Sequence, residues 1–360
     1  MLKKVTKFAF LFCSIFIFLL CGESETGKEN TKKEGSGNKL EIVGAGATFP
    51  YPLYSKMFDT YSKQKGIQIN YQSIGSGGGI RQLTSRTVDF GATDAYMDDE
   101  ALSEHREIIH IPTCLGAVVV SYNLPGNPEL KIEPDVLADI YLGKIQNWDN
   151  KRIQETNPEV KLPSKKIAVM HRSDGSGTSF IFTDYLSKIS SNWKKKVGTG
   201  KSVNWPEGLG AKGNEGVAGV IKQAKGSIGY CELAYALHND MPVAGIKNKS
   251  GNFIKPEISS ISKAAAMDIP EDTRITLTNS DAEKGYPLSS FTWLLLYKEQ
   301  NYKNRSKELV TEMVKMIEWM LTHGQKYAKP LDYAPLPEQA RNTALAALKK
   351  IEYNGEQVLE

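Results

Sequence analysis

Cysteine and histidine are scarce in this chain, with four cysteines and five histidines among 360 residues. The histidines are scattered, and no group of His, Cys and carboxylate residues has the spacing of a metal-binding motif. So few cysteines also exclude a disulfide framework as the basis of the fold. Cys114 and Cys231 lie in apolar, strand-like runs, which favours two buried unpaired thiols, with a disulfide between them as the alternative.

A dominant charge of one sign is also lacking. The formal net charge is +4, and Lys3, Lys4 and Lys7 belong to an N-terminal segment that we expect to be removed, which leaves about +1 (4 − 3). There is no stripe of basic residues with interleaved aromatic ones. This composition argues against nucleic acid as a partner.

Long hydrophobic runs are limited to Phe8–Leu20, which follows the three early lysines. We expect an export signal at residues 1–20, because the run is too short for a stable membrane span; a retained signal anchor is the alternative. Cys21 stands where a bacterial lipoprotein carries its lipid, although Leu20 replaces the small residue of that pattern. Residues 21–38, rich in Glu, Lys, Gly, Ser and Thr, predict a disordered tether.

From Lys39 onward, strand-like and helix-like patterns alternate. Strands are expected at 40–43, 68–74, 88–92, 108–122, 166–170, 227–234 and 291–297. Helices are expected at 54–61, 76–83, 134–142, 180–189, 216–224, 309–321 (with Gly324 at its C-cap) and 336–351. This alternation predicts mostly parallel sheets flanked by helices, which bind ligands beyond the carboxyl ends of their strands.

Three short turns rich in glycine and hydroxyl residues, at 44–49, 75–79 and 174–179, are the most informative feature present. Each falls between a strand-like and a helix-like run. A helix N-terminus presents unpaired backbone N–H groups and a partial positive charge, and therefore suits an anion. Three such turns suggest donors that converge on one anion with several oxygens.

The side chains of these turns are hydrogen-bond donors with little countercharge. Arg172 donates in a planar fork to two oxygens, and Asp174 could hold that fork in place; an ordinary surface pair is the alternative. The other candidate donors are the hydroxyls of Thr48, Ser76, Ser176 and Thr178 and the backbone N–H groups near Phe49 and Gly177.

Asp94, at the end of the strand expected at 88–92, is unusual because a carboxylate repels an anion. Its presence makes sense if the ligand carries a proton, as monohydrogen or dihydrogen phosphate does and sulfate at neutral pH does not. Sulfate would leave the carboxylate without a donor, which predicts a thousandfold or greater preference at about 1.4 kcal/mol per factor of ten. The alternative role for Asp94 is that of a strand-end cap.

Catalytic motifs are absent. Ser176 lies near His171 and Asp174 in sequence, but its flanking glycines do not form the nucleophile elbow Gly-x-Ser-x-Gly. No phosphate-loop lysine follows the third turn, which argues against nucleotide binding. We therefore expect no enzyme activity, no cofactor and no metal.

Several longer stretches are distinctive: Gly44-Ala-Gly-Ala-Thr-Phe-Pro50, Tyr71-Gln-Ser-Ile-Gly-Ser-Gly-Gly-Gly79, Val88-Asp-Phe-Gly-Ala-Thr-Asp94, Ile140-Tyr-Leu-Gly-Lys-Ile145, Arg172-Ser-Asp-Gly-Ser-Gly-Thr-Ser-Phe180, Val197-Gly-Thr-Gly200 and Trp205-Pro-Glu-Gly-Leu-Gly-Ala-Lys-Gly-Asn214. With them the chain resembles, from about Leu40 to near its C-terminus, the phosphate-binding proteins of phosphate-specific ABC importers. The resemblance implies a two-lobed type II periplasmic binding fold, α/β in each lobe, that closes over one phosphate without covalent chemistry.

The resemblance also carries over the family's ligand roles, with Asp174 as the residue that orients Arg172. The implied phosphate ligands are Thr48, Phe49 (through its N–H), Ser76, Asp94, Arg172, Ser176, Gly177 and Thr178. The expected domains are lobe I at 39–115 and 286–360 and lobe II at 116–285. The implied partners are inorganic phosphate and the inner-membrane ABC permease, for a periplasmic monomer that is lipid-anchored through Cys21.

Two other functions stay open from the sequence alone. One is a secreted phosphatase on the same fold, and the other is a surface-exposed interaction lipoprotein whose phosphate site is vestigial. Arsenate, which is also protonated and of similar shape, is an alternative ligand for the same site.

Overall fold

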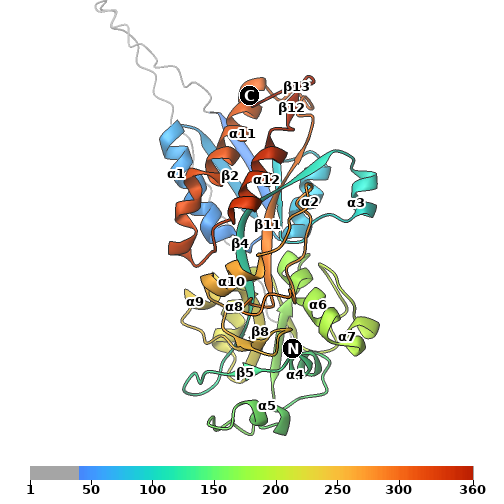
Figure 1. The fold of residues 1–360 in the computed structure, drawn as a ribbon, viewed down its shortest axis with the longest axis vertical. Coiled ribbons are helices and arrows are strands. Elements are labelled where there is room, and N and C mark those ends of the chain that lie inside the picture. Colours follow the sequence, from blue (N-terminus) through green and yellow to red (C-terminus); the bar gives the residue numbers. More distant parts are fainter. Residues whose placement is uncertain (1–39, 360) are drawn as a thin grey trace, which may run out of the picture. The chain divides into compact units, whose positions relative to one another are not determined.

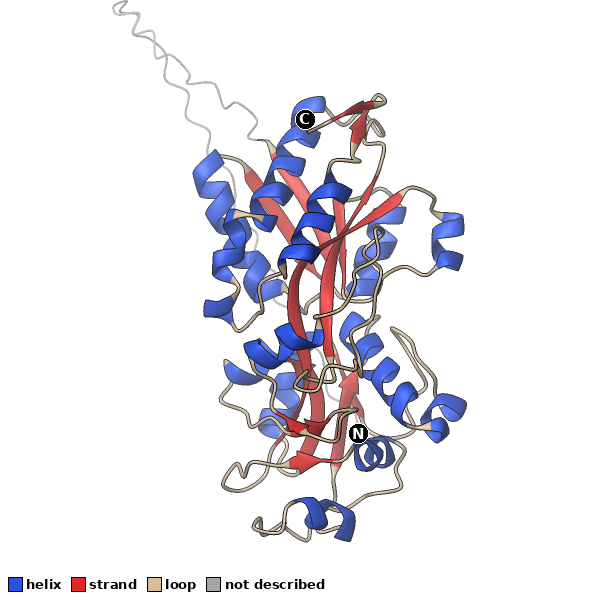
Figure 2. Ribbon diagram, in the orientation of Figure 1, coloured by secondary structure: helices blue, strands red, loops and turns tan. Residues whose placement is uncertain are grey.

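Eight strands form one continuous sheet in the order β2-β1-β3-β11-β4-β8-β6-β7 (Figures 1 and 2). The computed structural model describes residues 40–359, so the expected signal peptide, the tether and Cys21 lie outside the described residues. The sheet divides into two parts that share the long strand β4 (Ile108–Tyr122). We call these parts lobe I and lobe II.

Lobe I contains three parallel strands, β1 (Glu41–Gly46), β2 (Gln68–Ser73) and β3 (Phe90–Thr93). Strand β11 (Ser289–Tyr297) lies antiparallel between β3 and the Ile108–Ala117 part of β4. The helices of this lobe are α1 (Tyr51–Lys65), α2 (Ser76–Thr84), α3 (Asp99–Glu104), α11 (Lys307–Leu321) and α12 (Glu338–Leu348). The 3-10 helices η1 (His323–Tyr327) and η2 (Lys329–Leu331) and the hairpin β12 (Glu352–Tyr353)–β13 (Glu356–Gln357) complete it.

Lobe II contains the parallel strands β8 (Ser227–Glu232), β6 (Ala168–Arg172) and β7 (Leu209–Ala211), joined to the Val118–Tyr122 part of β4 by antiparallel pairing with β8. Its helices are α4 (Pro134–Tyr141), α5 (Lys151–Thr156), α6 (Gly177–Ile189), α7 (Ser191–Lys196), α8 (Gly213–Gln223), α9 (Leu233–Leu237) and α10 (Ile258–Ala264). A separate small sheet holds β5 (Lys131–Ile132), β9 (Gly245–Lys247) and β10 (Phe253–Ile254).

The pairing of β4 with β11 contains one irregularity. Thr292 faces Cys114 and Trp293 faces Pro112, so Thr113 has no direct partner across the pair. Such a bulge bends a strand and changes the direction of the side chains around it. Thr113 Oγ1 lies 2.6 Å from the Tyr54 hydroxyl and donates to the Thr292 carbonyl at 3.2 Å. The bulge therefore lies beside Thr292, whose side chain belongs to the site described below.

The expected strands and helices are present, with two corrections. Helix α11 ends at Leu321 and Thr322 is its C-cap, so Gly324 does not cap it but lies in η1. The strand expected at 227–234 ends at Glu232, because the Glu232 side chain accepts the Ala234 N–H and starts α9. The α/β, two-lobed fold class is confirmed, and three of the strands in each lobe run parallel.

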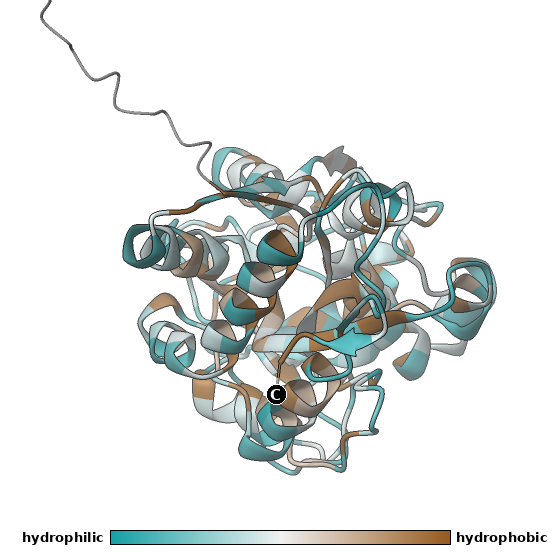
Figure 3. Ribbon diagram, turned by 90° about the horizontal axis from the view of Figure 1, so that it is seen from above, coloured by the Kyte–Doolittle hydropathy of each residue, from teal (hydrophilic) through white to brown (hydrophobic). Residues whose placement is uncertain are grey.

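Buried apolar faces hold the helices against the sheet. In α11 the side chains of Val310, Met313, Val314 and Ile317 recur at helical spacing and are fully buried. Figure 3 shows the same alternation, with hydrophobic and hydrophilic surfaces along single helices. Of the helices in the described part of the chain, none is long and apolar enough to cross a membrane.

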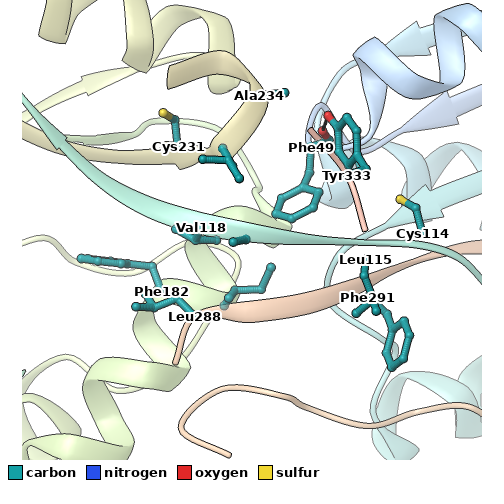
Figure 4. Packing of buried hydrophobic residues seen from close by; sticks show 14 of the residues in the cluster. Phe49, Cys114, Leu115, Val118, Phe182, Cys231, Ala234, Leu288, Phe291 and Tyr333 are labelled. Atoms are coloured by element: carbon teal, nitrogen blue, oxygen red, sulfur yellow. Dashed lines mark hydrogen bonds between the residues drawn. The ribbon is translucent and has the colours of Figure 1, made fainter. Parts of the chain in front are cut away.

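Both late cysteines are buried, free thiols, as the sequence favours, and Figure 4 shows them well apart, Cys114 on β4 and Cys231 on β8. Burial raises the pKa of both the Cys114 and the Cys231 thiol, which keeps them protonated and unreactive.

Candidate functional site

The carboxyl ends of β1, β2 and β6 carry the three glycine-rich turns, as expected, and α1, α2 and α6 begin just after them. The second and third turns touch across the lobes, where Gly77 donates its N–H to the Gly175 carbonyl at 2.9 Å. Gly75 has a φ of +86°, and a Cβ at this position would lie 2.5 Å from Asp174 Oδ2. Only glycine allows this approach, so the turns of the two lobes form one site.

Backbone donors gather at the N-terminal ends of three helices, α1, α2 and α6. Among the described residues, the hydrogen bonds provide no acceptor for the N–H groups of Phe49, Ser76, Gly177 and Thr178. The N-cap of α6, Ser176, accepts the Ser179 N–H at 3.0 Å and leaves the first two N–H groups of the helix available. A Cβ on Gly177 would lie 2.5 Å from Ser76 Oγ and 2.7 Å from Asp94 Oδ2. The N-termini of α2 and α6 are therefore adjacent.

Arg172 is the buried cation of the site. Its Nε donates to Asp174 Oδ1 at 2.7 Å and its Nη2 to Asp174 Oδ2 at 2.6 Å, while Nη1 donates to Thr178 Oγ1 at 3.3 Å. The Gly213 N–H also donates to Asp174 Oδ1, at 3.1 Å. Burial raises the pKa of Asp174, but the Arg172 guanidinium and the N–H donors outweigh it and hold the pKa below its usual value. Two hydrogen bonds to Asp174 thus fix the plane of the Arg172 guanidinium.

Asp94 is a buried carboxyl opposite these donors. Its Oδ1 accepts from the Thr292 hydroxyl at 2.8 Å, and its Oδ2 from the Ser76 hydroxyl at 3.3 Å. Burial raises its pKa to about 7, against the lowering effects of the Thr292 hydrogen bond, the Arg172 charge and the Ser76 hydrogen bond. A carboxyl with this pKa can hold or accept a proton near neutral pH.

Asn214 links the hydroxyls of the two lobes. Its Nδ2 donates to Thr48 Oγ1 at 2.8 Å and to Thr178 Oγ1 at 3.1 Å, and its backbone N–H donates to Thr48 Oγ1 at 3.2 Å. Its Oδ1 accepts the Glu232 N–H at 2.9 Å. The amide therefore has all its hydrogen bonds within the protein and holds Thr48 next to Thr178.

The predicted site residues come together, apart from Cys21, which lies outside the described residues. Contacts or near approaches connect Thr48, Ser76, Asp94, Arg172, Asp174, Gly177 and Thr178, and Ser176 caps the helix that carries two of them. Phe49 lies in the first turn, and its ring packs against Gly116 of β4 (Figure 4), so only its backbone can face the site. The site side chains are buried against one another, whereas a cavity of about 510 Å³ between α1 and β2 is lined by other residues.

Three polar residues around the site were not singled out from the sequence. Thr292 is a hydroxyl residue in the apolar strand β11, which is the signal that could have found it. Asn214 ends the last of the distinctive stretches, and Tyr235, whose hydroxyl donates to the Thr48 carbonyl at 2.6 Å, lies just beyond β8. Within residues 40–359 no group of three or more His, Cys, Asp or Glu residues could hold a metal ion.

Comparisons with known proteins agree with this geometry. The model of the PBP superfamily domain matches residues 26–321. The phosphate-binding protein PstS of Pasteurella multocida is 44% identical over 303 residues, covering 83% of this chain and 87% of that protein. The PstS protein of Haemophilus influenzae is 43% identical over 307 residues, covering 84% of this chain and 90% of its own length.

Solved structures show the same fold at lower identity. A high affinity periplasmic phosphate-binding protein (PfluDING), solved with bound phosphate, superposes with a TM-score of 0.67 at 20% identity and covers 85% of this chain and 93% of that one. The superfamily match and the identity to curated relatives lead to one conclusion: the chain belongs to the PBP superfamily and, within it, to the family of the PstS phosphate-binding proteins.

Proposed function

We propose that the chain binds one inorganic phosphate between its lobes and delivers it to an ABC importer, without a catalytic step. The observation that supports this most strongly is the pairing of a buried proton acceptor, Asp94, with a surrounding set of donors. Hydroxyls, helix N-termini and the N–H groups of Arg172 that are not bonded to Asp174 would satisfy the phosphate oxygens. Asp94 would accept the proton that phosphate keeps at neutral pH.

The ligand set that we propose is the one predicted from the sequence. Lobe I would supply Thr48, the Phe49 N–H, Ser76 and Asp94. Lobe II would supply Arg172, Ser176, Gly177 and Thr178, with Asp174 behind Arg172. We propose lobe boundaries at 39–115 with 286–360 and at 116–285, close to the point where β4 changes partner from β11 to β8.

For the cellular setting, we propose a periplasmic monomer that is anchored by a lipid on Cys21 through the 21–38 tether and docks on an inner-membrane permease. The names of the relatives as binding proteins support a receptor rather than an enzyme. Ser176 Oγ accepts the Ser179 N–H as a helix cap, which supports a structural and binding role for this serine.

Titration calorimetry of phosphate and sulfate at pH 8 tests the proposal, with protein that has been unfolded and refolded to remove bound ligand. We expect micromolar or tighter phosphate binding and sulfate binding at least a thousandfold weaker. No heat with either anion would overturn the proposal and favour an interaction lipoprotein. Phosphomonoester turnover that disappears in Ser176→Ala would overturn it in favour of a phosphatase.

A further inference from the structure

Thr48 of lobe I is held by two residues of lobe II. The Tyr235 hydroxyl donates to the Thr48 carbonyl at 2.6 Å. Asn214 donates to the Thr48 hydroxyl twice, from Nδ2 at 2.8 Å and from its backbone N–H at 3.2 Å. Three hydrogen bonds from one lobe therefore end on a single residue of the other.

The bond from Tyr235 acts on a donor of the proposed phosphate site. The Thr48 carbonyl and the Phe49 N–H belong to the same peptide group, and among residues 40–359 that N–H has no acceptor. A hydrogen bond to the carbonyl of a peptide polarises the group and makes its N–H a stronger donor. Tyr235 therefore strengthens and orients the Phe49 N–H without touching the ligand.

The bonds from Asn214 determine the direction in which two hydroxyls donate. A hydroxyl has two acceptor positions and one proton. Asn214 fills both acceptor positions of Thr48 Oγ1, and together with Arg172 Nη1 it fills both of Thr178 Oγ1. Each hydroxyl keeps its proton free to donate to an anion and has no lone pair left for a hydrogen-bond donor.

Both residues are fixed by the same neighbour, Glu232, at the end of β8. The Glu232 N–H donates to Asn214 Oδ1 at 2.9 Å, and Glu232 Oε2 accepts the N–H of Ala234 at the start of α9, the helix that carries Tyr235. Asn214 and Tyr235 are thus both anchored on Glu232 within lobe II. From there both side chains bond Thr48 across the boundary to lobe I.

We propose that Tyr235 and Asn214 are positioning residues, and we call their three hydrogen bonds to Thr48 a latch. The latch orients the Thr48 hydroxyl and the Phe49 N–H so that both donate to the phosphate, and it slows the release of phosphate. The latch rests on the proposed phosphate function. The role of the latch differs from that of the residues that bind phosphate, because neither the Tyr235 nor the Asn214 side chain has to contact phosphate. The latch predicts an effect on dissociation rather than on the encounter of phosphate with the open protein.

Tyr235→Phe in the full chain tests the latch, because it removes one hydroxyl and keeps the ring. The matched control is Tyr286→Phe, whose fully buried hydroxyl has no hydrogen-bond partner among the described residues. Inorganic phosphate is titrated by calorimetry, and its binding and release rates are followed by stopped-flow tryptophan fluorescence. Urea unfolding without phosphate checks the fold of each variant.

We expect Tyr235→Phe to raise the phosphate Kd about three- to tenfold, the range of one hydrogen bond, almost entirely through faster release. Tyr286→Phe should stay within about twofold of the wild type. A Tyr235→Phe release rate within twofold of the wild type would overturn the latch, as would an equal change in the control. If the wild type binds no phosphate at all, the proposed function itself fails, which is a different result from a wild type that binds and a variant that matches it.

Discussion

The Arg172 guanidinium and the Asp174 carboxylate form a two-bond fork, with Nε 2.7 Å from Oδ1 and Nη2 2.6 Å from Oδ2. Arg172 ends β6 and Asp174 begins the turn that follows it, two residues later, and the guanidinium is almost completely buried. Because the fork fixes the plane of the guanidinium, its remaining N–H groups have a fixed direction toward the N-terminus of α6. The cation of the site is therefore oriented before any ligand arrives.

Arg172→Lys should weaken phosphate and sulfate binding alike, by about tenfold to a hundredfold. A lysine keeps the charge but cannot donate in a plane to Asp174 and to an anion at once. Calorimetry with both anions measures the loss. The control is Arg152→Lys in α5, since Arg152 also donates twice to carboxylate oxygens, one of Asp139 and one of Asp135, but away from the site. A loss confined to one of the two anions would contradict the general role of Arg172.

Asp94→Asn should reduce the preference for phosphate over sulfate by at least tenfold, because an amide can donate to a sulfate oxygen where a carboxylate cannot. The pKa of about 7 adds a dependence on pH. In the wild type, sulfate binding should strengthen as the pH falls from 8.5 to 5.5 and Asp94 becomes protonated, whereas the variant should bind sulfate about equally at both. Equal losses of phosphate and sulfate affinity in Asp94→Asn would contradict this role.

Thr292→Val should raise the pKa of Asp94 above about 7. The Thr292 hydroxyl donates to Oδ1 and stabilises the ionised carboxyl, so its loss favours the protonated form. The measurement is a carbon NMR titration of the Asp94 carboxyl in phosphate-free protein. Thr292→Ser keeps the hydroxyl and should leave the pKa near that of the wild type. A lower or unchanged pKa in the valine variant would show that this hydrogen bond does not stabilise the carboxylate.

Glu232→Gln should be tolerated at pH 6 and become stabilising as the pH rises. The Tyr333 hydroxyl donates to the Phe49 carbonyl at 2.7 Å and to Glu232 Oε2 at 3.1 Å, so its single proton is shared between two acceptors. Burial raises the pKa of Glu232 well above its usual value, and the charges of Asp332 and Asp94 raise it further. This raised pKa favours the protonated, neutral carboxyl in the folded protein.

The sign of the pH effect follows from this raised pKa. The stability that a protonated Glu232 contributes is complete below the pKa of the unfolded chain and is lost as the pH rises through the folded pKa. Glutamine is neutral at every pH and avoids that loss. The measurement is the free energy of unfolding in urea at pH 6 and pH 9. Relative to the wild type, Glu232→Gln should be more stable at pH 9 than at pH 6, while Glu159→Gln, at an exposed position, should show no such change. A large destabilisation of Glu232→Gln at pH 6 would mean that the carboxyl is ionised there.

The sequence was sufficient to predict those parts of the fold and the site that depend on residues close together in the chain. The three turns, their helices and the Arg172–Asp174 pair are each set by residues close together in the chain. Thr292 could not be assigned in this way, because it meets Asp94 across 198 positions through the pairing of β11 with β3. Asn214 and Tyr235 likewise gain their roles only when the lobes meet at Thr48.

Short helices and strands were also not predicted from the sequence. Between Ala234 and Ser289 the chain forms two- and three-residue strands and a seven-residue helix, too short for a periodic pattern to appear. The end of α11 at Leu321 was predicted correctly, but its C-cap was misplaced, because Gly324 looks like a capping glycine whereas the chain tightens into η1 directly after Thr322. Tertiary contacts rather than local sequence decide such boundaries.

The position of β11 has a consequence for the order in which the protein is made. This strand lies between β3 and β4 in the sheet but begins only at Ser289, whereas β3 ends at Thr93 and β4 at Tyr122. On the ribosome, β3 and β4 are complete long before the strand that joins them exists, so their facing edges stay open until residue 297 has been synthesised. The strands of lobe II come from one uninterrupted stretch and need no later segment. Lobe II can therefore fold first, and lobe I closes around its last central strand.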